Sequence, residues 1–324
     1  MYIKLAKKEL EQLKALSLQL TIDPNEYPDL YCQKAKELSA MVPTRIINLL
    51  TSFAENGSTS GFLLFRDLYF DDILPDTPID NTQNIGSKTL FACIQSILLS
   101  IIADPLAYEA ECNGSLFQDV VPISETERIQ TSTSSKTELE IHTEQAFSPL
   151  KPDILSLACI RGDPNALTHI LTLNTIFEYI SLDDLELLFR PLWLIGVDYS
   201  FKKNKEVFLA GNIRGPMSIL SGSILDPKLV FDQDLMTGLT DKAKYMMEKI
   251  IKIYYEHRYS YNLQKGEIIF IDNNRAVHGR SSFSPKYDKN DRFLIRCFGV
   301  FDIEKSSYAR TDIKNSRKIL SIYS

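Results

Sequence analysis

The spacing of apolar residues changes along this chain from helical to strand-like, and that change limits the fold more than any other feature. In the first third, apolar residues recur at helical spacing among Lys, Glu and Gln. Helices are predicted there over residues 5–20, 30–41, 44–55 and 90–103, with Ser87 capping the last of them. From Leu116 onward the apolar runs are short and bounded by Gly, Pro, Asn or Asp, which is typical of strands.

The short apolar runs predict a strand-rich second part of the chain. Strands are expected over residues 153–160, 207–213, 267–271 and 293–300, with helical inserts at 174–190 and 241–257. Short strands behind a helical N-terminal part favour a mixed α+β fold with a mainly β core. We expect a double-stranded β-helix (jelly roll, cupin-like) with flanking helices.

No linker rich in Pro or Gly divides the chain, so one domain over residues 1–324 is predicted. Residues 1–115 form its mainly helical part, which packs on the jelly roll. Residues 116–324 form the jelly-roll core with helical and lid inserts.

Composition excludes several classes of protein. The net charge is −6 and the basic residues are scattered, so no nucleic-acid partner is expected. The five cysteines are odd in number and show no CxxC spacing, as expected for buried thiols in a reducing compartment. No apolar segment has the pattern of a signal peptide or the length of a membrane span. A cytoplasmic protein without a membrane partner is predicted, and a homo-oligomer remains open.

One segment, residues 124–137, consists largely of Ser, Thr, Glu, Gln and Lys. Such a composition packs poorly into a core and predicts a mobile loop. A plain surface loop is one interpretation. Because the segment directly precedes His142, an active-site lid is the other, and we call residues 124–137 the lid segment.

The chain has four histidines, and one of them lies two residues before a glutamate, in His142-Thr143-Glu144. On a strand, side chains at i and i+2 point to the same face, so both can reach one metal ion. A second histidine from a distant strand, His278, completes a 2-His-1-carboxylate set, which is typical of iron(II) sites with open positions. The alternative is a surface His and Glu on a strand. The remaining histidines, His169 and His257, lack such a context and are expected to be structural or exposed.

Two arginines follow His278 on a predicted strand. Arg292 and Arg296 are four residues apart with apolar residues between them, so both are expected to point inward. Buried guanidinium groups require anions, and bidentate pairing suits a dicarboxylate such as 2-oxoglutarate. The alternative for each arginine is an ion pair with a structural Asp or Glu.

Several separated motifs resemble one known family. They are the runs 117–122, 142–153, 157–163, 231–236 and 273–280. In this order they are similar to the clavaminate-synthase-like branch of the 2-oxoglutarate-dependent oxygenases. Within it, the chain resembles hydroxylases of free amino acids, which act on lysine, arginine or asparagine.

The resemblance implies roles for individual residues. The iron ligands and catalytic centre would be His142, Glu144 and His278, with Glu144 also touching the substrate. Arg292 would grip the distal carboxylate of 2-oxoglutarate, with support from the hydroxyl of Thr168. Four further residues would contact the amino acid: Arg296 its α-carboxylate, Gln118 its α-amino group, and Asp232 and Asp234 its side chain.

The implied function is iron(II)- and 2-oxoglutarate-dependent hydroxylation of an unactivated side-chain carbon of a free basic L-amino acid. L-lysine is slightly favoured over L-arginine, with O2 consumed and succinate and CO2 released. The presence of Glu144 argues against the related halogenases, which lack the carboxylate ligand. Three alternatives stay open. They are a hydroxylase of a neutral amino acid such as asparagine or citrulline, a non-catalytic cupin-like protein that binds or senses a metal, and an oxygenase of a carrier-bound or peptidyl substrate, against which Arg296 argues if it holds a free α-carboxylate.

Overall fold

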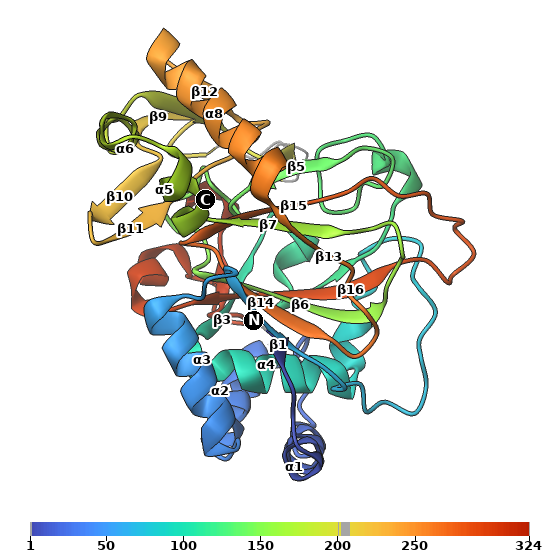
Figure 1. Cartoon of the computed structure of the whole chain (residues 1–324). Helices are drawn as coiled ribbons and strands as arrows, with labels where there is room; N and C mark the ends of the chain where they lie inside the picture. Colours follow the sequence, from blue (N-terminus) through green and yellow to red (C-terminus); the bar gives the residue numbers. More distant parts are fainter. Residues whose placement is uncertain (1, 200, 202–207, 324) are drawn as a thin grey trace.

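The computed structural model describes residues 2–199, 201 and 208–323, and these residues form a mixed α+β fold (Figure 1). The long helices are α1 (Lys7–Ser17), α2 (Pro28–Ser39), α3 (Thr44–Asn56), α4 (Leu90–Ile102) and α8 (Asp241–His257). Two short helices are α5 (Leu173–Tyr179) and α6 (Leu182–Leu188). The mixed α+β class predicted from the pattern is confirmed.

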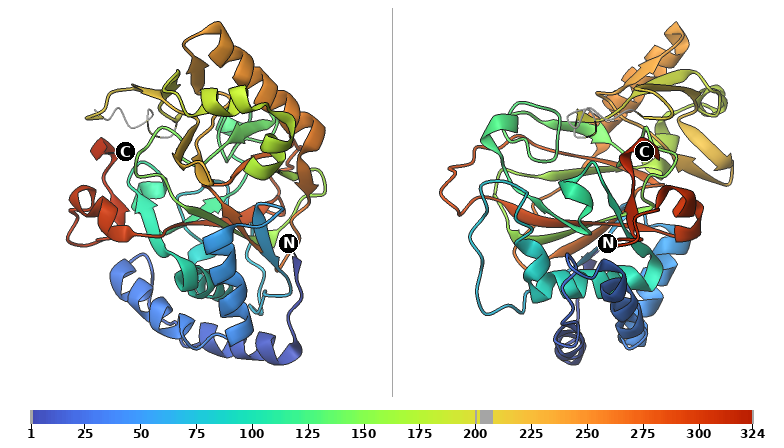
Figure 2. Two further views of the ribbon diagram at one scale, coloured as in Figure 1. Left: turned by 60° about the vertical axis from the view of Figure 1, so that its left-hand side comes forward. Right: turned by 180° about the vertical axis from the view of Figure 1, so that it is seen from behind.

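The largest sheet has eight strands in the order β1-β2-β14-β6-β16-β3-β17, with β4 also paired to β16. Its strands are β1 (Tyr2–Ile3), β2 (Phe62–Phe65), β3 (Asp104–Tyr108), β4 (Phe117–Val120), β6 (Ile154–Arg161), β14 (Ile268–Asp272), β16 (Phe293–Val300) and β17 (Lys318–Ile319). Helices α1 to α4 cover one face of this sheet (Figures 1 and 2).

A four-stranded sheet in the order β13-β7-β15-β5 lies on the other side of the large sheet. Its strands are β5 (Leu139–His142), β7 (Thr168–Thr172), β13 (Tyr259–Tyr261) and β15 (Ala276–Arg280). Two small sheets complete the fold, with strands β8 (Trp193–Gly196), β9 (Ile213–Met217), β10 (Leu220–Ser223), β11 (Asp226–Leu229) and β12 (Met236–Gly238).

Alternate residues of the large sheet divide between two hydrophobic cores, as the two-residue period of a strand requires. Ile269 of β14 belongs to the core that also contains Ile170 of β7 and Val277 of β15. Its neighbour Phe270 belongs to the core that contains Leu98 of α4. The large sheet is therefore buried on both faces, which explains why β14 and β16 are apolar at nearly every position, with Asp272 and Arg296 as the charged exceptions.

Three local predictions are wrong. The cap of α4 is Thr89, whose hydroxyl accepts a hydrogen bond from the Ala92 N–H at 3.1 Å, and Ser87 lies in a preceding 3-10 turn. The helix predicted over 174–190 is two helices, because Ser181 begins α6 with its own capping box. No strand fills 207–213: residue 207 lies outside the described residues, a turn follows, and β9 begins only at Ile213.

No helix in the described part of the chain has both the length and the apolar character needed to cross a membrane. The division of the chain into one domain stays a prediction.

Candidate active site

Two antiparallel strands bring the predicted triad together. His142 ends β5 directly opposite His278 on β15, and the two ring centroids are 4.5 Å apart. Gly279 lets these strands approach, because an added Cβ there would lie 2.6 Å from the carbonyl oxygen of Leu139. Glu144 follows β5, and the ligand atoms of the three side chains all lie within 4.8 Å of one another. Glu144 is only 6% exposed and His142 is partly buried, so these two residues do not form the alternative surface His–Glu pair.

Neighbouring groups hold the triad in place. The Nδ1 of His142 donates to the backbone oxygen of Glu140 at 2.8 Å, because a carbonyl can only accept, and this leaves the Nε2 lone pair for a metal. The side chain of Asn273 brackets the backbone of Glu144. Its Oδ1 accepts from the Glu144 N–H at 2.7 Å, and its Nδ2 donates to the Glu144 carbonyl at 3.2 Å.

The electrostatics of the triad favour a cation. Burial raises the pKa of Glu144, but Arg296 and the two histidines outweigh burial and hold that pKa at about 2. Burial, followed by the neighbouring His278, lowers the pKa of His142. An ionised Glu144 carboxylate beside a His142 imidazole whose neutral form is favoured suits a divalent metal.

A small cavity beside the triad is lined by Thr168, Arg280 and Arg292 together with apolar side chains from β4, β6 and β16. Arg292 is 6% exposed, and burial lowers its pKa to about 10. Among the described residues no carboxylate lies within ion-pair distance of Arg292, so the alternative of a structural ion pair is not realised there. A buried guanidinium without an anion is the arrangement expected of a site that binds a carboxylate ligand.

Arg296 is different, because it already has anionic partners. Its Nη2 donates to Glu111 at 2.6 Å, and its Nη1 lies 3.5 Å from Glu144. Its Nε donates to the Oε1 of Gln118 at 2.9 Å. The structural-pair alternative therefore holds for Arg296 in part. The amide oxygen of Gln118, which was expected to meet an α-amino group, is engaged by Arg296.

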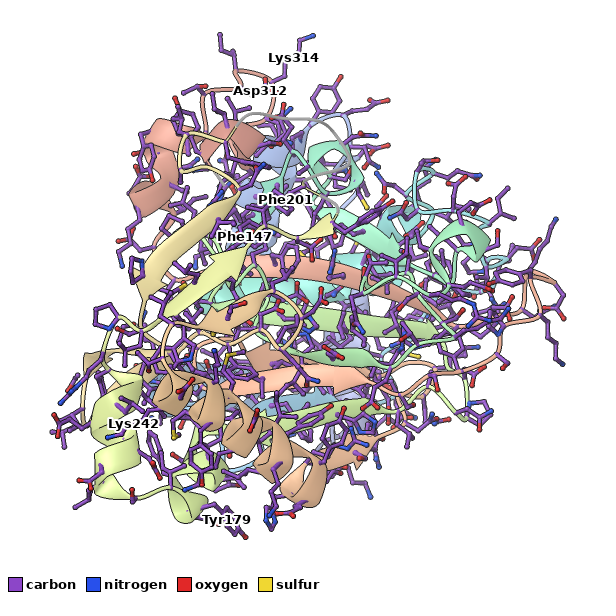
Figure 3. All side chains as sticks on the ribbon, turned by 90° about the horizontal axis from the view of Figure 1, so that it is seen from above. Phe147, Tyr179, Phe201, Lys242, Asp312 and Lys314 are labelled. Carbon is purple, nitrogen blue, oxygen red and sulfur yellow. The ribbon has the colours of Figure 1, made fainter. Side chains whose placement is uncertain are left out.

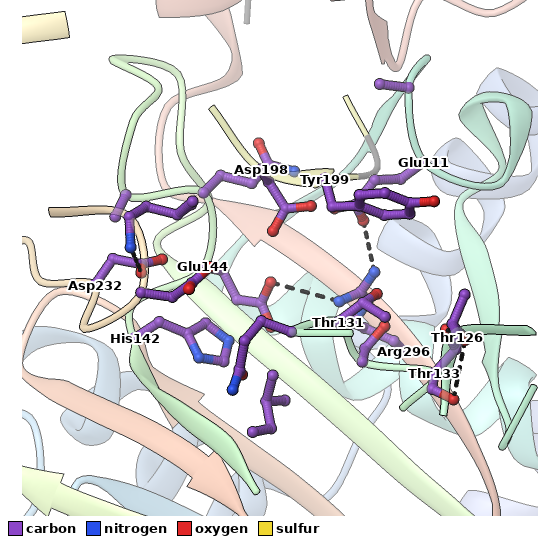
Figure 4. Close-up of a pocket in the computed structure, with 18 of the residues that line it drawn as sticks. Glu111, Thr126, Thr131, Thr133, His142, Glu144, Asp198, Tyr199, Asp232 and Arg296 are labelled. Atoms are coloured by element: carbon purple, nitrogen blue, oxygen red, sulfur yellow. Dashed lines mark hydrogen bonds and ion pairs between the residues drawn. The ribbon is translucent and has the colours of Figure 1, made fainter. Parts of the chain in front are cut away.

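A larger cavity of about 260 Å³ adjoins the small cavity, and Figure 4 shows it in close-up. It shares His142, Glu144 and Arg296 with the small cavity. Its described lining carries six carboxylates, from Glu111, Glu140, Glu144, Asp198, Asp232 and Asp234. Arg296 is the one Lys or Arg among the described lining residues, so this cavity is strongly anionic.

Asp232 and Asp234, the predicted acidic pair, both line this cavity, but the backbone conformation that places them there differs from the expected one. An extended segment would have turned Asp232 and Asp234 to one face, but residues 233–235 form a turn. Asp232 bridges His142 in a short strand pair, and its Oδ1 accepts from the Leu235 N–H at 2.8 Å. Burial raises the pKa of Asp232 to about 7. Asp234 is exposed, yet both aspartates line the cavity.

Sequence reasoning missed Glu111 and the pair Asp198 and Tyr199, which stand over the cavity in Figure 4. Glu111 is 8% exposed, and burial raises its pKa to about 7 despite the nearby Arg296. None of these residues belongs to a motif. Only the contact between Glu111 and Arg296, which are far apart in sequence, reveals the role of Glu111.

One aromatic pair reaches the large cavity, whereas the remaining histidines, His169 and His257, line neither cavity. Phe147 lines the large cavity and packs edge-on against Phe201 at 4.9 Å (Figure 3). His257 stacks on Tyr179 at 3.9 Å, and His169 makes a hydrogen bond to Ser260, as expected for structural histidines.

The lid segment lies beside the cavities, as predicted, and is irregular apart from a 3-10 turn over residues 124–126. Its second half is not a loose loop, however, because Thr133, Ser134 and Ser135 are buried. Arg280 donates hydrogen bonds to the carbonyl and hydroxyl of Ser134, and the hydroxyl of Thr133 pairs with that of Thr126, so part of this buried polar segment is satisfied. The mobility of the lid segment stays a prediction.

Comparisons with known proteins agree with this geometry. Residues 218–298 match the family model described as "Taurine catabolism dioxygenase TauD, TfdA family". The chain is 42% identical to the L-lysine 3-hydroxylase of Catenulispora acidiphila over 87% of this chain and 78% of that protein. It is 28% identical to the L-asparagine oxygenase of Streptomyces coelicolor over 95% and 92% of the two chains.

Solved structures show the same fold. A crystal structure of asparagine oxygenase with Fe(II), 3-hydroxyasparagine and succinate matches with a TM-score of 0.89, at 26% identity, over 98% of this chain and 99% of that one. The non-heme iron oxygenase OrfP with Fe, succinate and (3S)-hydroxy-L-Arg matches with a TM-score of 0.87, at 25% identity, over 98% and 99% of the two chains.

Proposed function

This chain belongs to the clavaminate-synthase-like iron(II)- and 2-oxoglutarate-dependent oxygenases, and we propose that it hydroxylates an unactivated side-chain carbon of a free basic L-amino acid. L-lysine is favoured over L-arginine, because the relative with 42% identity is a lysine hydroxylase. The observation that carries the proposal is the anionic cavity directly beside the His–Glu–His cluster.

The residues at the site suit the family's cofactor and co-substrate. His142, Glu144 and His278 would hold iron(II), since their ligand atoms converge and the Glu144 carboxylate stays ionised. Arg292 would pair with the distal carboxylate of 2-oxoglutarate, with Thr168 beside it. When bound, iron and 2-oxoglutarate would activate O2 for C–H hydroxylation, with one oxygen atom entering the amino acid and the other entering succinate as 2-oxoglutarate loses CO2. The chain positions both reactants and excludes water from the buried triad.

We also propose that the strand core is a double-stranded β-helix. The large sheet and the four-stranded sheet share one hydrophobic core, and the triad lies on the smaller of them. The structural match to asparagine oxygenase covers nearly the whole chain, which supports this assignment.

The large cavity complements a zwitterion with a cationic side chain. Arg296 would pair with the substrate α-carboxylate. Glu111 is the better acceptor for the α-ammonium, because the Gln118 oxygen already accepts from Arg296. Asp232 and Asp234 would then meet the side-chain cation, whose charge would offset the cost of two carboxylates in one cavity.

The proposal is tested with the twenty amino acids, each incubated with the iron-loaded protein and 2-oxoglutarate. Succinate formation is expected with L-lysine above L-arginine, and with the neutral amino acids well below both. Succinate formation with only neutral amino acids such as asparagine would instead favour a hydroxylase of a neutral amino acid. Absence of any amino-acid-dependent succinate would favour a non-catalytic metal-binding protein.

Asp232→Asn and Asp234→Asn are each expected to raise the KM for the basic amino acid by about ten-fold, because one lost charge-assisted contact costs roughly 1.5–3 kcal/mol. Asparagine keeps an oxygen for the Leu235 N–H, so the turn at residues 233–235 survives. Iron affinity is expected to change much less. Asp241→Asn, at an exposed position outside the cavity, is the control. Full activity in both cavity variants contradicts recognition of the side-chain cation.

A further inference from the structure

Besides Arg292 and Arg296, the small cavity is lined by a third buried arginine, Arg280, to which the proposed function assigns no task. It lies two residues after His278 on β15, so both side chains face the same way, and it is 4% exposed. Like Arg292, it forms no ion pair with a carboxylate of the described residues. Two guanidinium groups that repel each other across one cavity favour an anion between them.

All the hydrogen-bond acceptors of Arg280 are neutral, and nearly all belong to the lid segment. Its Nη1 donates to the carbonyl of Ser134 at 2.7 Å and to that of Ser132 at 3.4 Å. Its Nη2 donates to the hydroxyl of Ser134 at 3.1 Å and to the carbonyl of Thr137 at 3.3 Å. The ring of Phe283 packs on the guanidinium, 5.0 Å away from centroid to Cζ. Arg280 therefore links β15 to the second half of the lid segment through hydrogen bonds.

That half of the lid segment is also a wall of the large cavity. Gln130, Thr131, Ser132 and Thr133 line the large cavity, and Ser132 lines the small cavity as well. A change at Arg280 therefore reaches both cavities through residues 132–137. No other described arginine of the small cavity donates hydrogen bonds to this segment.

We propose that Arg280 is a positioning residue that couples dicarboxylate binding in the small cavity to closure of residues 130–137 over the large cavity. This inference rests on the proposed function, since the dicarboxylate is 2-oxoglutarate and the large cavity takes the amino acid. A carboxylate bound beside Arg292 offsets the electrostatic repulsion between the guanidinium groups of Arg292 and Arg280. The Arg280 guanidinium is then held more firmly in its hydrogen bonds to the carbonyls of Ser134 and Thr137. Once residues 130–137 are ordered, the large cavity binds the amino acid more tightly. The increase in affinity measures the coupling free energy between the two sites.

Two measurements on the intact chain, loaded with Zn(II) in place of iron so that no turnover occurs, test the coupling. The first is amide hydrogen exchange of residues 130–137 in the unsubstituted protein, with and without 2-oxoglutarate and before any amino acid is added. Exchange is expected to slow on adding 2-oxoglutarate. Equal exchange in the two states overturns the proposal, and this result does not depend on any variant folding.

The second measurement is the Kd for L-lysine with and without 2-oxoglutarate, in the unsubstituted protein and in Arg280→Lys. We expect 2-oxoglutarate to tighten lysine binding by at least about 5-fold in the unsubstituted protein. Arg280→Lys keeps the positive charge but loses the planar guanidinium group. In this variant, the ratio of the lysine Kd without 2-oxoglutarate to the lysine Kd with it is expected to fall toward one. The affinity for 2-oxoglutarate itself changes little, because Arg292 still holds it.

Arg161→Lys is the matched control, because Arg161 also donates to neutral loop acceptors, Thr77 and the carbonyl of Pro75, but lies outside both cavities. It is expected to leave the ratio unchanged. An unchanged ratio in Arg280→Lys overturns the proposal. So does a ten-fold loss of 2-oxoglutarate affinity with the ratio intact, which would make Arg280 a direct ligand of the dicarboxylate. If no amino acid binds in any state, the proposed function fails, and the exchange experiment still judges the coupling separately.

Discussion

His278→Ala is expected to abolish iron binding and amino-acid-dependent succinate formation while leaving the fold largely intact. The side chain supplies one of three converging ligand atoms, and a metal held by two protein ligands loses most of its affinity. His142→Ala and Glu144→Ala are expected to behave in the same way. Iron is measured by anaerobic Fe(II) titration, and folding by the thermal transition of the metal-free protein.

His257→Gln is the control for the triad variants, because His257 stacks on Tyr179 and lies outside the site. It is expected to bind iron and turn over normally. Hydroxylation at an ordinary rate by His278→Ala would show that the triad assignment is wrong.

Replacing Arg292 by alanine or lysine is expected to raise the KM for 2-oxoglutarate by about ten-fold or more, since a charged hydrogen-bond pair contributes roughly 1.5–3 kcal/mol. Lysine keeps the charge but not the planar fork that matches a carboxylate. The KM for the amino acid and the iron affinity are expected to change less. Steady-state kinetics with each substrate varied in turn separate these effects.

Arg161→Lys again serves as the control, because Arg161 binds a loop away from the small cavity. An unchanged KM for 2-oxoglutarate in the Arg292 variants would rule out the role of Arg292 as the carboxylate clamp.

Local pattern was enough to predict the elements whose environment repeats along the sequence. The α8 helix and the β16 strand were predicted with the observed bounds, because an amphipathic face or a continuous apolar run extends over the whole element. The triad was also accessible from sequence. The i, i+2 spacing of His142 and Glu144 and the resemblance around His278 needed no knowledge of how distant segments pack.

Predictions failed where short-range signals compete. Ser87 and Thr89 are both good helix caps, and the backbone after Thr89 decides between them. The turn at residues 233–235 could not be distinguished from an extended segment, because its Asp232–Leu235 hydrogen bond forms only when the chain bends.

The sequence by itself determined the class of chemistry, since a metal triad and two inward arginines require particular side chains at particular spacings. Only the tertiary structure decided how the charges combine. Arg296 is paired with Glu111, whereas Arg292 is left without a carboxylate partner among the described residues, and the two arginines are otherwise alike in sequence. Arg280 was only the last residue of the 273–280 motif, with no role of its own, until the fold placed residues 132–137 against it. The physical reason is that ion pairs and buried hydrogen bonds join residues far apart in the chain, and their partners are selected by packing rather than by local pattern.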